Sequence, residues 1–290
     1  MSHLLAADRV RFGRRKDLWG LALFVPLMLA AIFLSEFNGL TTPPQDDFFI
    51  DPPDPVMQAQ MHDQVMADFR QRVAQDLPAF AFPASLVKVA GDVAPLILMA
   101  LYLATALIAG EFEWGTVRTL HLTTSRARTL AVRLLVILGF MGVMAAVGLL
   151  FAAIAPFLLS FEGKPLQAFA QPAPDVLPEV GTRLLVVLPF ISIPALMAVL
   201  GRSTAAAFIL TLLFVVADLA ITGLPVWMDS PAPWVRVLTV SGSITRLLGG
   251  EDAPLATIAP AWVSIVALAS WAIIPAVAAI GLFRRLDLNE

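Results

Sequence analysis

The sequence of 290 residues contains no cysteine, which excludes disulfides, thiolate metal sites and cysteine nucleophiles. Charged residues make up only 14% of it, whereas a soluble domain has about 25%. Its three histidines, at positions 3, 62 and 121, lie far apart in the sequence, which argues against a histidine metal cluster. The net charge of −3 gives no indication of nucleic-acid binding.

A phosphate-binding loop is also absent. No Gly-x-x-x-x-Gly-Lys-Ser/Thr motif occurs, and the three lysines lack its glycine-rich context. The sequence therefore contains no motif with which the chain itself could cradle the phosphates of ATP. We expect no catalytic residue and no metal site in this chain.

Apolar residues are abundant instead. They make up 59% of the chain, and the mean hydropathy is +0.83. Lipid tolerates this much apolar surface, and a membrane span needs about 20 apolar residues. We therefore predict an all-α integral membrane protein with six transmembrane helices in a single transmembrane domain over residues 1–290. The six apolar runs are 18–35, 86–109, 130–159 with a candidate break at Pro156, 184–200, 205–224 and 258–283.

Lysine and arginine are divided unequally among the loops. Eleven of the nineteen basic residues precede the first span, lie between spans two and three or four and five, or follow the sixth span, and a twelfth, Arg133, lies just inside span three. The loop 37–85, by contrast, holds seven aspartates and two arginines. Because cytoplasmic loops carry the basic excess, we predict a multi-pass protein of the cytoplasmic (inner) cell membrane with both termini in the cytoplasm.

Two helices are predicted outside the spans. Residues 1–16 combine apolar residues with arginines, which predicts a short interfacial helix on the inner leaflet; a disordered basic tail is the alternative. In the outer-face insert 37–85, Asp54 and Pro55 form a helix start, and apolar residues recur at every fourth position as far as Leu77. We predict an amphipathic helix over 54–77 whose apolar stripe covers lipid or the outer ends of the spans.

Three charged residues fall inside the outer parts of the predicted spans, where charge is costly. One interpretation is structural, with snorkelling to the interface and local pairs such as Lys88 with the acid four residues later. The other is a polar lining for the outer exit of a transport path. The candidate lining residues are Asp92, Arg183 and Asp218.

The least ordinary stretch is 110–126, which follows span two on the predicted cytoplasmic side. It contains two acids where the helix leaves the membrane, a glycine that permits a break, a threonine that can cap a new helix, and aliphatic residues that give this helix an apolar face. Such a helix can dock into a groove of a cytoplasmic partner; an ordinary amphipathic loop is the alternative. The candidate contact residues are Glu111, Glu113, Gly115, Thr116, Val117, Leu120 and Arg126.

This stretch resembles the signature between spans two and three of type-2 ABC transporter permeases. The family usually has proline before the Ser-Arg pair and lysine at the last position, where this chain has Thr124 and Arg133. The resemblance implies that residues 1–16 are an elbow helix and that about 112–124 form a coupling helix against an ATPase subunit. The residues that carry it are Glu111, Glu113, Gly115, Thr116, Leu120, Ser125, Arg126 and Arg133.

The resemblance further implies a permease subunit of an ATP-driven transporter, an exporter, working in membrane lipid as a homo- or heterodimer with two ATPase subunits. ATP and Mg²⁺ would then be bound by the ATPases, and this chain would not be an enzyme. Two alternatives remain. One is a non-transporting transmitter or sensor that relays ATPase motion to an outer-face protein through the insert 37–85. The other is an intramembrane hydrolase that uses Glu111, Glu113 and His121.

Overall fold

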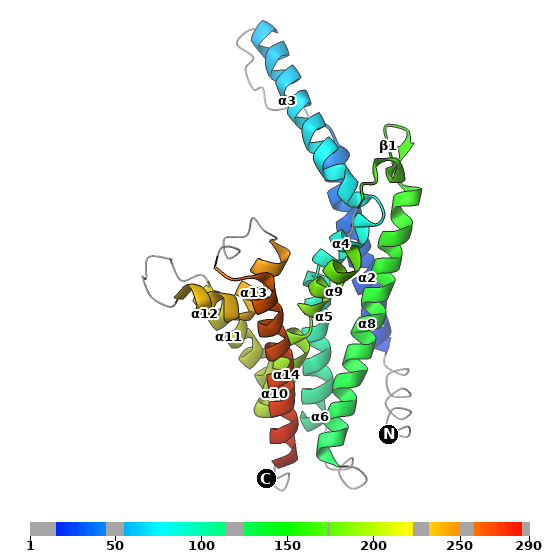
Figure 1. The fold of residues 1–290 in the computed structure, drawn as a ribbon. Helices are drawn as coiled ribbons and strands as arrows, with labels where there is room; N and C mark the ends of the chain where they lie inside the picture. Colours follow the sequence, from blue (N-terminus) through cyan, green and yellow to red (C-terminus); the bar gives the residue numbers. More distant parts are fainter. Residues whose placement is uncertain are drawn as a thin grey trace. The chain divides into compact units, whose positions relative to one another are not determined.

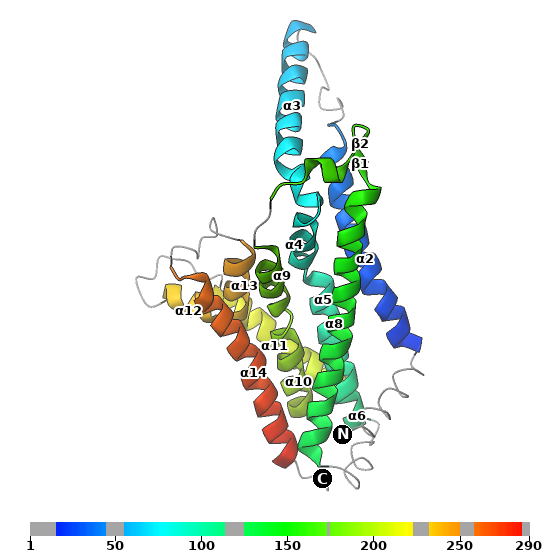
Figure 2. The same ribbon diagram turned by 45° about the vertical axis from the view of Figure 1, so that its right-hand side comes forward.

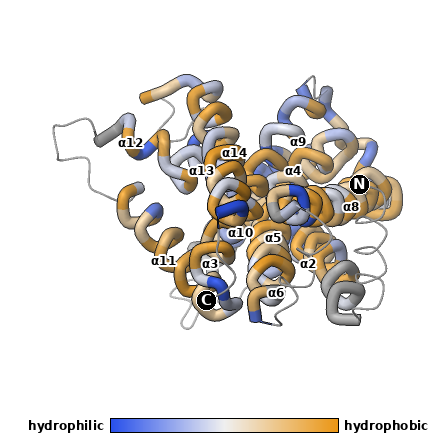
Figure 3. Tube along the Cα trace, turned by 90° about the horizontal axis from the view of Figure 1, so that it is seen from below, coloured by the Kyte–Doolittle hydropathy of each residue, from blue (hydrophilic) through white to orange (hydrophobic). Residues whose placement is uncertain are grey.

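A computed structural model describes residues 16–44, 55–113, 125–172, 175–222, 232–249 and 258–285 (Figure 1). These residues are mostly helical, and Figure 3 shows the predominantly hydrophobic colouring of helices such as α5, α8 and α11. Within the described ranges, five helical segments are long and apolar enough to cross a membrane, or six if one bent pair is a single span. The five are Leu23–Thr41, Ala127–Leu158, Val176–Gly201, Thr204–Thr222 and Ala261–Arg285.

The elements follow the predicted order of spans and loops. In chain order they are α2 (Lys16–Thr41), α3 (Pro55–Asp76), η2 (Leu77–Phe80), α4 (Ala84–Gly91), α5 (Ala94–Ala104), the π-helix η3 (Thr105–Ala109), α6 (Gly110–Glu113), α8 (Arg126–Leu158), β1 (Ser160–Phe161), β2 (Lys164–Pro165), η4 (Leu166–Phe169), α9 (Val176–Leu185), α10 (Pro189–Gly201), α11 (Thr204–Thr222), α12 (Ala232–Leu238), α13 (Val240–Leu248) and α14 (Ala261–Arg285).

The run expected to form the second span is bent. Its two halves, Ala84–Gly91 and Ala94–Ala109, meet at an angle of 47°. Pro95 has no N–H with which to reach the carbonyl of Gly91, four residues back, so the helix cannot continue regularly there. The fourth span is interrupted for the same reason at Pro189, and the carbonyl of Leu185 accepts instead from the N–H of Leu188, at 3.1 Å.

The candidate break at Pro156 is absent, because α8 continues to Leu158. Proline at this position leaves the carbonyl of Ala152 without its helical donor. The hydroxyl of Ser85 donates to that carbonyl at 2.7 Å. A polar side chain of another element thus supplies the missing hydrogen bond, as membrane helices with internal prolines require.

The same arrangement recurs in α14. Pro275 leaves the carbonyl of Trp271 without its helical donor, and the buried hydroxyl of Ser192, from α10, donates to it at 2.9 Å. The indole N–H of Trp271 in turn donates to the carbonyl of Leu238 at 2.8 Å. Polar contacts therefore fix α14 against α10 and α12.

The chain forms two compact units. Unit 1 comprises Met1–Val25, Val93–Ala145 and Gly181–Glu290, and unit 2 comprises Pro26–Asp92 and Ala146–Val180. Unit 2 therefore combines the insert 37–85 with the residues 159–180 that follow α8, a pairing that the sequence did not predict.

The core of unit 2 is aromatic. Phe33 is fully buried and meets Phe80 and Phe151 edge-on, with ring centroids 5.1 and 5.7 Å apart. The side-chain amide of Gln167, beyond the β1–β2 hairpin, accepts from the N–H of Phe82 and donates to its carbonyl. Two loops distant in sequence are thereby joined through the backbone of one residue, Phe82.

The predicted helix of the insert is α3, which begins at Pro55; the proposed cap Asp54 lies outside the described residues. Its apolar residues do not form one straight stripe. Each four-residue step overshoots a helical turn by about 40°, so positions sixteen residues apart face nearly opposite directions. Val73 and Leu77, near its end, are buried in unit 2, whereas residues 60–65 are exposed on every side of the helix, Met61 and Val65 among them.

We predict that Ser192→Ala lowers the free energy of unfolding by about 1–3 kcal/mol, because it leaves a buried carbonyl without a donor. Pro275→Ala restores a backbone N–H for the same carbonyl. In that background Ser192→Ala should therefore lower the free energy of unfolding clearly less. The measurement is unfolding of the purified protein in detergent. Ser270→Ala, an exposed serine of α14, is the matched control. An equal loss of stability from Ser192→Ala in both backgrounds would show that the Ser192 hydroxyl does not stabilise the protein through the Trp271 carbonyl.

Candidate functional site

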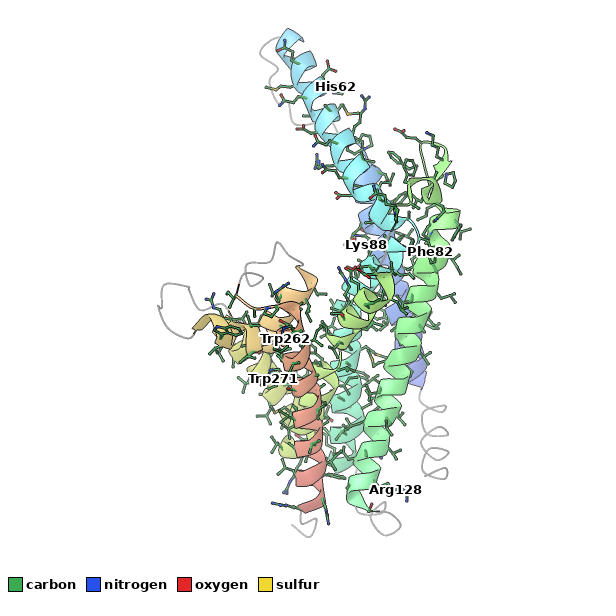
Figure 4. The ribbon with its side chains drawn as sticks, in the orientation of Figure 1. His62, Phe82, Lys88, Arg128, Trp262 and Trp271 are labelled. Atoms are coloured by element: carbon green, nitrogen blue, oxygen red, sulfur yellow. The ribbon has the colours of Figure 1, made fainter. Side chains whose placement is uncertain are left out.

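The candidate site lies at one end of unit 1, which we call the basic end. The end of α6, the turn between α10 and α11, and the last turn of α14 meet there. Figure 4 shows Arg128, near the start of α8, at this same end. The arginines of these elements are Arg128, Arg202, Arg284 and Arg285.

The turn between α10 and α11 is tight and leaves the first N–H groups of α11 accessible. Arg202 adopts the left-handed conformation, with φ 54° and ψ 8°. A side chain at Gly201 would place its Cβ 2.9 Å from that of Ala206, which only glycine avoids. The hydroxyl of Ser203 accepts from the N–H of Ala206 at 3.1 Å and so caps α11.

Glu113 binds the start of α11. One carboxylate oxygen accepts from the N–H of Thr204 at 2.6 Å, and the other accepts from the Thr204 hydroxyl at 3.0 Å. An anion at this position is favoured by the partial positive charge of a helix N-terminus. Of the two acids in the sequence motif, Glu113 therefore has a partner within the chain, 91 residues away in sequence.

The neighbouring residue contacts a third element. The ring of Phe112 meets that of Phe283 edge-on, with centroids 5.7 Å apart, and Phe283 is buried. Phe112 therefore joins α6 to the last turn of α14. Phe112 and Glu113 immediately precede residues 114–124. Together they connect the end of α6 to α11 and α14.

Arg133, the last position of the motif, is buried in the first half of α8. Its guanidinium donates to the carbonyl of Leu107 at 2.8 Å. Leu107 lies in the π-helix Thr105–Ala109, a turn type that is frequent at functional sites. Two charged side chains of the motif, Glu113 and its last residue Arg133, thus bind the backbone of another helix.

The rest of the coupling prediction lies outside the described residues, as does the elbow helix apart from Lys16, which begins α2. Arg126 begins α8 and Glu111 lies in α6, but their side chains are not among those described. The predicted coupling helix therefore stays a prediction. The motif residues outside the described ranges are Gly115, Thr116, Val117 and Leu120.

Asp218, one of the three candidate lining residues, is buried and binds the start of α13. Its carboxylate accepts from the N–H groups of Val240 and Ser241, at 2.9 and 2.7 Å, and from the Ser241 hydroxyl. Gly242 permits the start of α13 to lie close to the backbone of α12, since a Cβ there would lie 1.8 Å from the carbonyl oxygen of Arg236. These contacts give Asp218 a structural role that the sequence left open.

The other two candidates lie where helices end. Asp92 follows α4 at the bend before α5, and Arg183 is in the last turn of α9. The ion pair that the structure shows for Lys88 is with Glu36, and the Lys88 ammonium also lies 4.5 Å from the ring centroid of Phe80. A lining role for the three residues stays a prediction.

No alternative metal chemistry emerges from the part of the chain that the structure describes. No group of three histidine or acidic side chains there could hold a metal ion. Glu113, one of the two acids considered for an intramembrane hydrolase, is hydrogen-bonded to Thr204.

We predict that Arg133→Ala destabilises the protein by about 1–3 kcal/mol, because the Leu107 carbonyl loses a charged donor in a buried setting. Arg128→Ala, on the exposed first turn of the same helix, should change stability by no more than about 0.5 kcal/mol. Thermal unfolding of the two variants in the same detergent makes the comparison. Equal losses of stability in the two variants would mean that the hydrogen bond of Arg133 to Leu107 does not stabilise the protein.

The whole chain was compared with known proteins. No protein-family model, no curated protein and no solved structure matches it. The sequence motif and the contacts at the basic end are therefore the features that indicate a function.

Proposed function

We propose that the chain is the membrane-spanning permease subunit of an ATP-driven transporter, an exporter, and that its basic end contacts a separate ATPase subunit. The observation that carries the proposal is the hydrogen bonding of Glu113 to the start of α11. A segment that receives a push from a partner must be connected to the helices that move. Glu113 supplies this connection directly beside 114–124.

The proposed route has three branches. Movement of 114–124 would pass through Glu113 to Thr204 and α11, and through Phe112 to Phe283 and α14. The same segment leads directly into α8, which Arg133 binds to the π-helix preceding α6. The Glu113–Thr204 hydrogen bonds lie at the exposed surface, whereas Phe283 and Arg133 are buried. Through these contacts a displacement of the segment would turn or shift whole helices.

The proposal includes six spans, both termini in the cytoplasm, and a homo- or heterodimer of permeases with two ATPases. Support for six spans comes from the five long apolar helices together with the bent pair α4–α5. Support for the orientation comes from the arginines at the basic end. ATP and Mg²⁺ are assigned to the ATPases, since the sequence has no motif for them.

A second candidate function is a transmitter that passes ATPase motion to a protein on the outer face. Unit 2 favours it, because two outer loops form a compact structure there rather than simple span connections. Both functions need the ATPase. A measurement of substrate flux across the membrane distinguishes them, because only the permease transports a substrate.

The test combines a pull-down of the ATPase with ATP hydrolysis by the reconstituted complex. Leu120→Asp should abolish both, because a charge on the apolar face of the coupling segment opposes docking. Glu113→Ala should leave the ATPase bound but reduce the stimulation of hydrolysis by substrate several-fold, because the push no longer reaches α11. Glu113→Gln keeps one oxygen acceptor. Its stimulation of hydrolysis by substrate should lie between that of Glu113→Ala and that of the unsubstituted protein.

Asp63→Asn, on the exposed surface of α3, serves as the control for loss of one acid. It should behave as the unsubstituted protein in both assays. Normal hydrolysis and binding in both Leu120→Asp and Glu113→Ala would contradict the coupling proposal.

A further inference from the structure

Unit 2 contains a groove of about 830 Å³ beside the second half of α3. The opposite wall is formed by the β1–β2 hairpin and η4, and Figure 2 shows α3 extending past this hairpin. Met66 and Phe69 are only partly buried, so the described residues leave apolar side chains uncovered here, which is unfavourable in water. The large apolar residues of the lining are Met66, Phe69, Val73, Leu77, Phe161 and Phe169.

The chain that follows α2 starts at the end of this groove nearest to η2. Pro43 lines the groove, and shortly before it the rings of Phe37 in α2 and Phe80 in η2 meet with centroids 5.7 Å apart. Residues 45–54 lie outside the described residues, and the chain is described again from Pro55, the first residue of α3. These ten residues therefore connect the η2 end of the groove to the opposite end of α3.

The length of this connection limits its path. From the level of the groove residues Val73 and Leu77, α3 rises about 27–33 Å to its start at Pro55. The eleven steps from Pro44 to Pro55 span at most about 36–40 Å when the chain is fully extended. A connection of this length has to advance by about 2.5–3 Å per residue, and so it has to run nearly straight along α3.

The two ends of the connection lie on the same side of α3. Pro55 and Val73 are eighteen residues apart, which is five complete turns of about 3.6 residues, so Pro55 begins α3 on the face that lines the groove. At about 2.5–3 Å per residue, positions 48–50 come about 10–18 Å along the connection. That distance corresponds to the level of Met66 and Phe69 on α3.

The residues at these three positions are apolar. Phe48, Phe49 and Ile50 are the large apolar residues of a connection that otherwise consists of aspartate, glutamine and proline. In an extended chain successive side chains point to opposite sides, so either Phe49 or its two neighbours can face α3. Either arrangement brings apolar side chains to an apolar groove and removes both surfaces from water.

We propose that the groove of unit 2 is the docking site for the chain's own residues 48–50, which insert phenylalanine or isoleucine side chains beside Met66 and Phe69. Docking in this way gives α3 a second support besides its connection to η2. The proposal concerns unit 2 alone. It does not depend on whether the chain transports a substrate.

The first test measures disulfide formation, because the chain has no native cysteine. Phe48→Cys and Phe49→Cys are each combined with Met66→Cys, and the full chain is oxidised in nanodiscs. At least one pair should form a disulfide within a single chain, and at least tenfold faster than when Asp68→Cys replaces Met66→Cys. Asp68 is the matched control because it is exposed at a similar level on the opposite side of α3.

Two results would overturn the proposal. One is cross-linking of both pairs no faster than in the Asp68→Cys controls. The other is a disulfide-linked dimer in place of the cross-linked single chain, because it would show that residues 48–50 of a second copy fill the groove.

The second test measures how fast a charged maleimide reacts with Met66→Cys. Replacing residues 48–50 by serine in the same chain should raise this rate at least tenfold, because the groove loses its cover. Met61→Cys, at a position that is 42% exposed on another side of α3, should react at the same rate in both backgrounds. An unchanged rate at Met66→Cys would contradict the proposal.

Discussion

Backbone carbonyls that lose their helical donor must find another one when no water is near, and much of this structure follows from that requirement. Pro156 and Pro275 each release a carbonyl, and a serine from another helix donates to each, at 2.7 and 2.9 Å. Arg133 donates to a carbonyl of the π-helix in the same way. The irregular points of the apolar helices are thus also the points where helices are joined to one another.

Helix N-termini raise the complementary problem, since their first N–H groups need acceptors. Glu113 serves α11 and Asp218 serves α13, each through hydrogen bonds to a helix distant in sequence. Such contacts hold helices at their ends, where small displacements turn an entire helix. This is the physical reason for proposing Glu113, rather than a lipid-facing surface, as the point that passes on motion from an ATPase.

The sequence predicted the helices well and their contacts poorly. Apolar runs located the long apolar helices, because span length is a local property, whereas the break considered at Pro156 is absent because Ser85 supplies the missing donor. The partner of Glu113 could not be predicted, because Thr204 lies in another loop and any helix start would have served. The prediction that the apolar stripe of α3 covers lipid or the outer ends of the spans stays a prediction: Val73, near the end of the helix, is buried, whereas Met61 and its neighbours toward the start are exposed on every side.

The central claim is that Glu113 carries motion from the ATPase contact to α11. Because the chain has no native cysteine, cysteines introduced at Arg128 and Ala205 can be spin-labelled without background, and both positions are exposed. The distance between the labels is measured by pulsed electron paramagnetic resonance in the ATPase complex, with and without trapped nucleotide. The account predicts a nucleotide-dependent shift in the otherwise unsubstituted protein that is lost in Glu113→Ala. An identical shift in Glu113→Ala would contradict it.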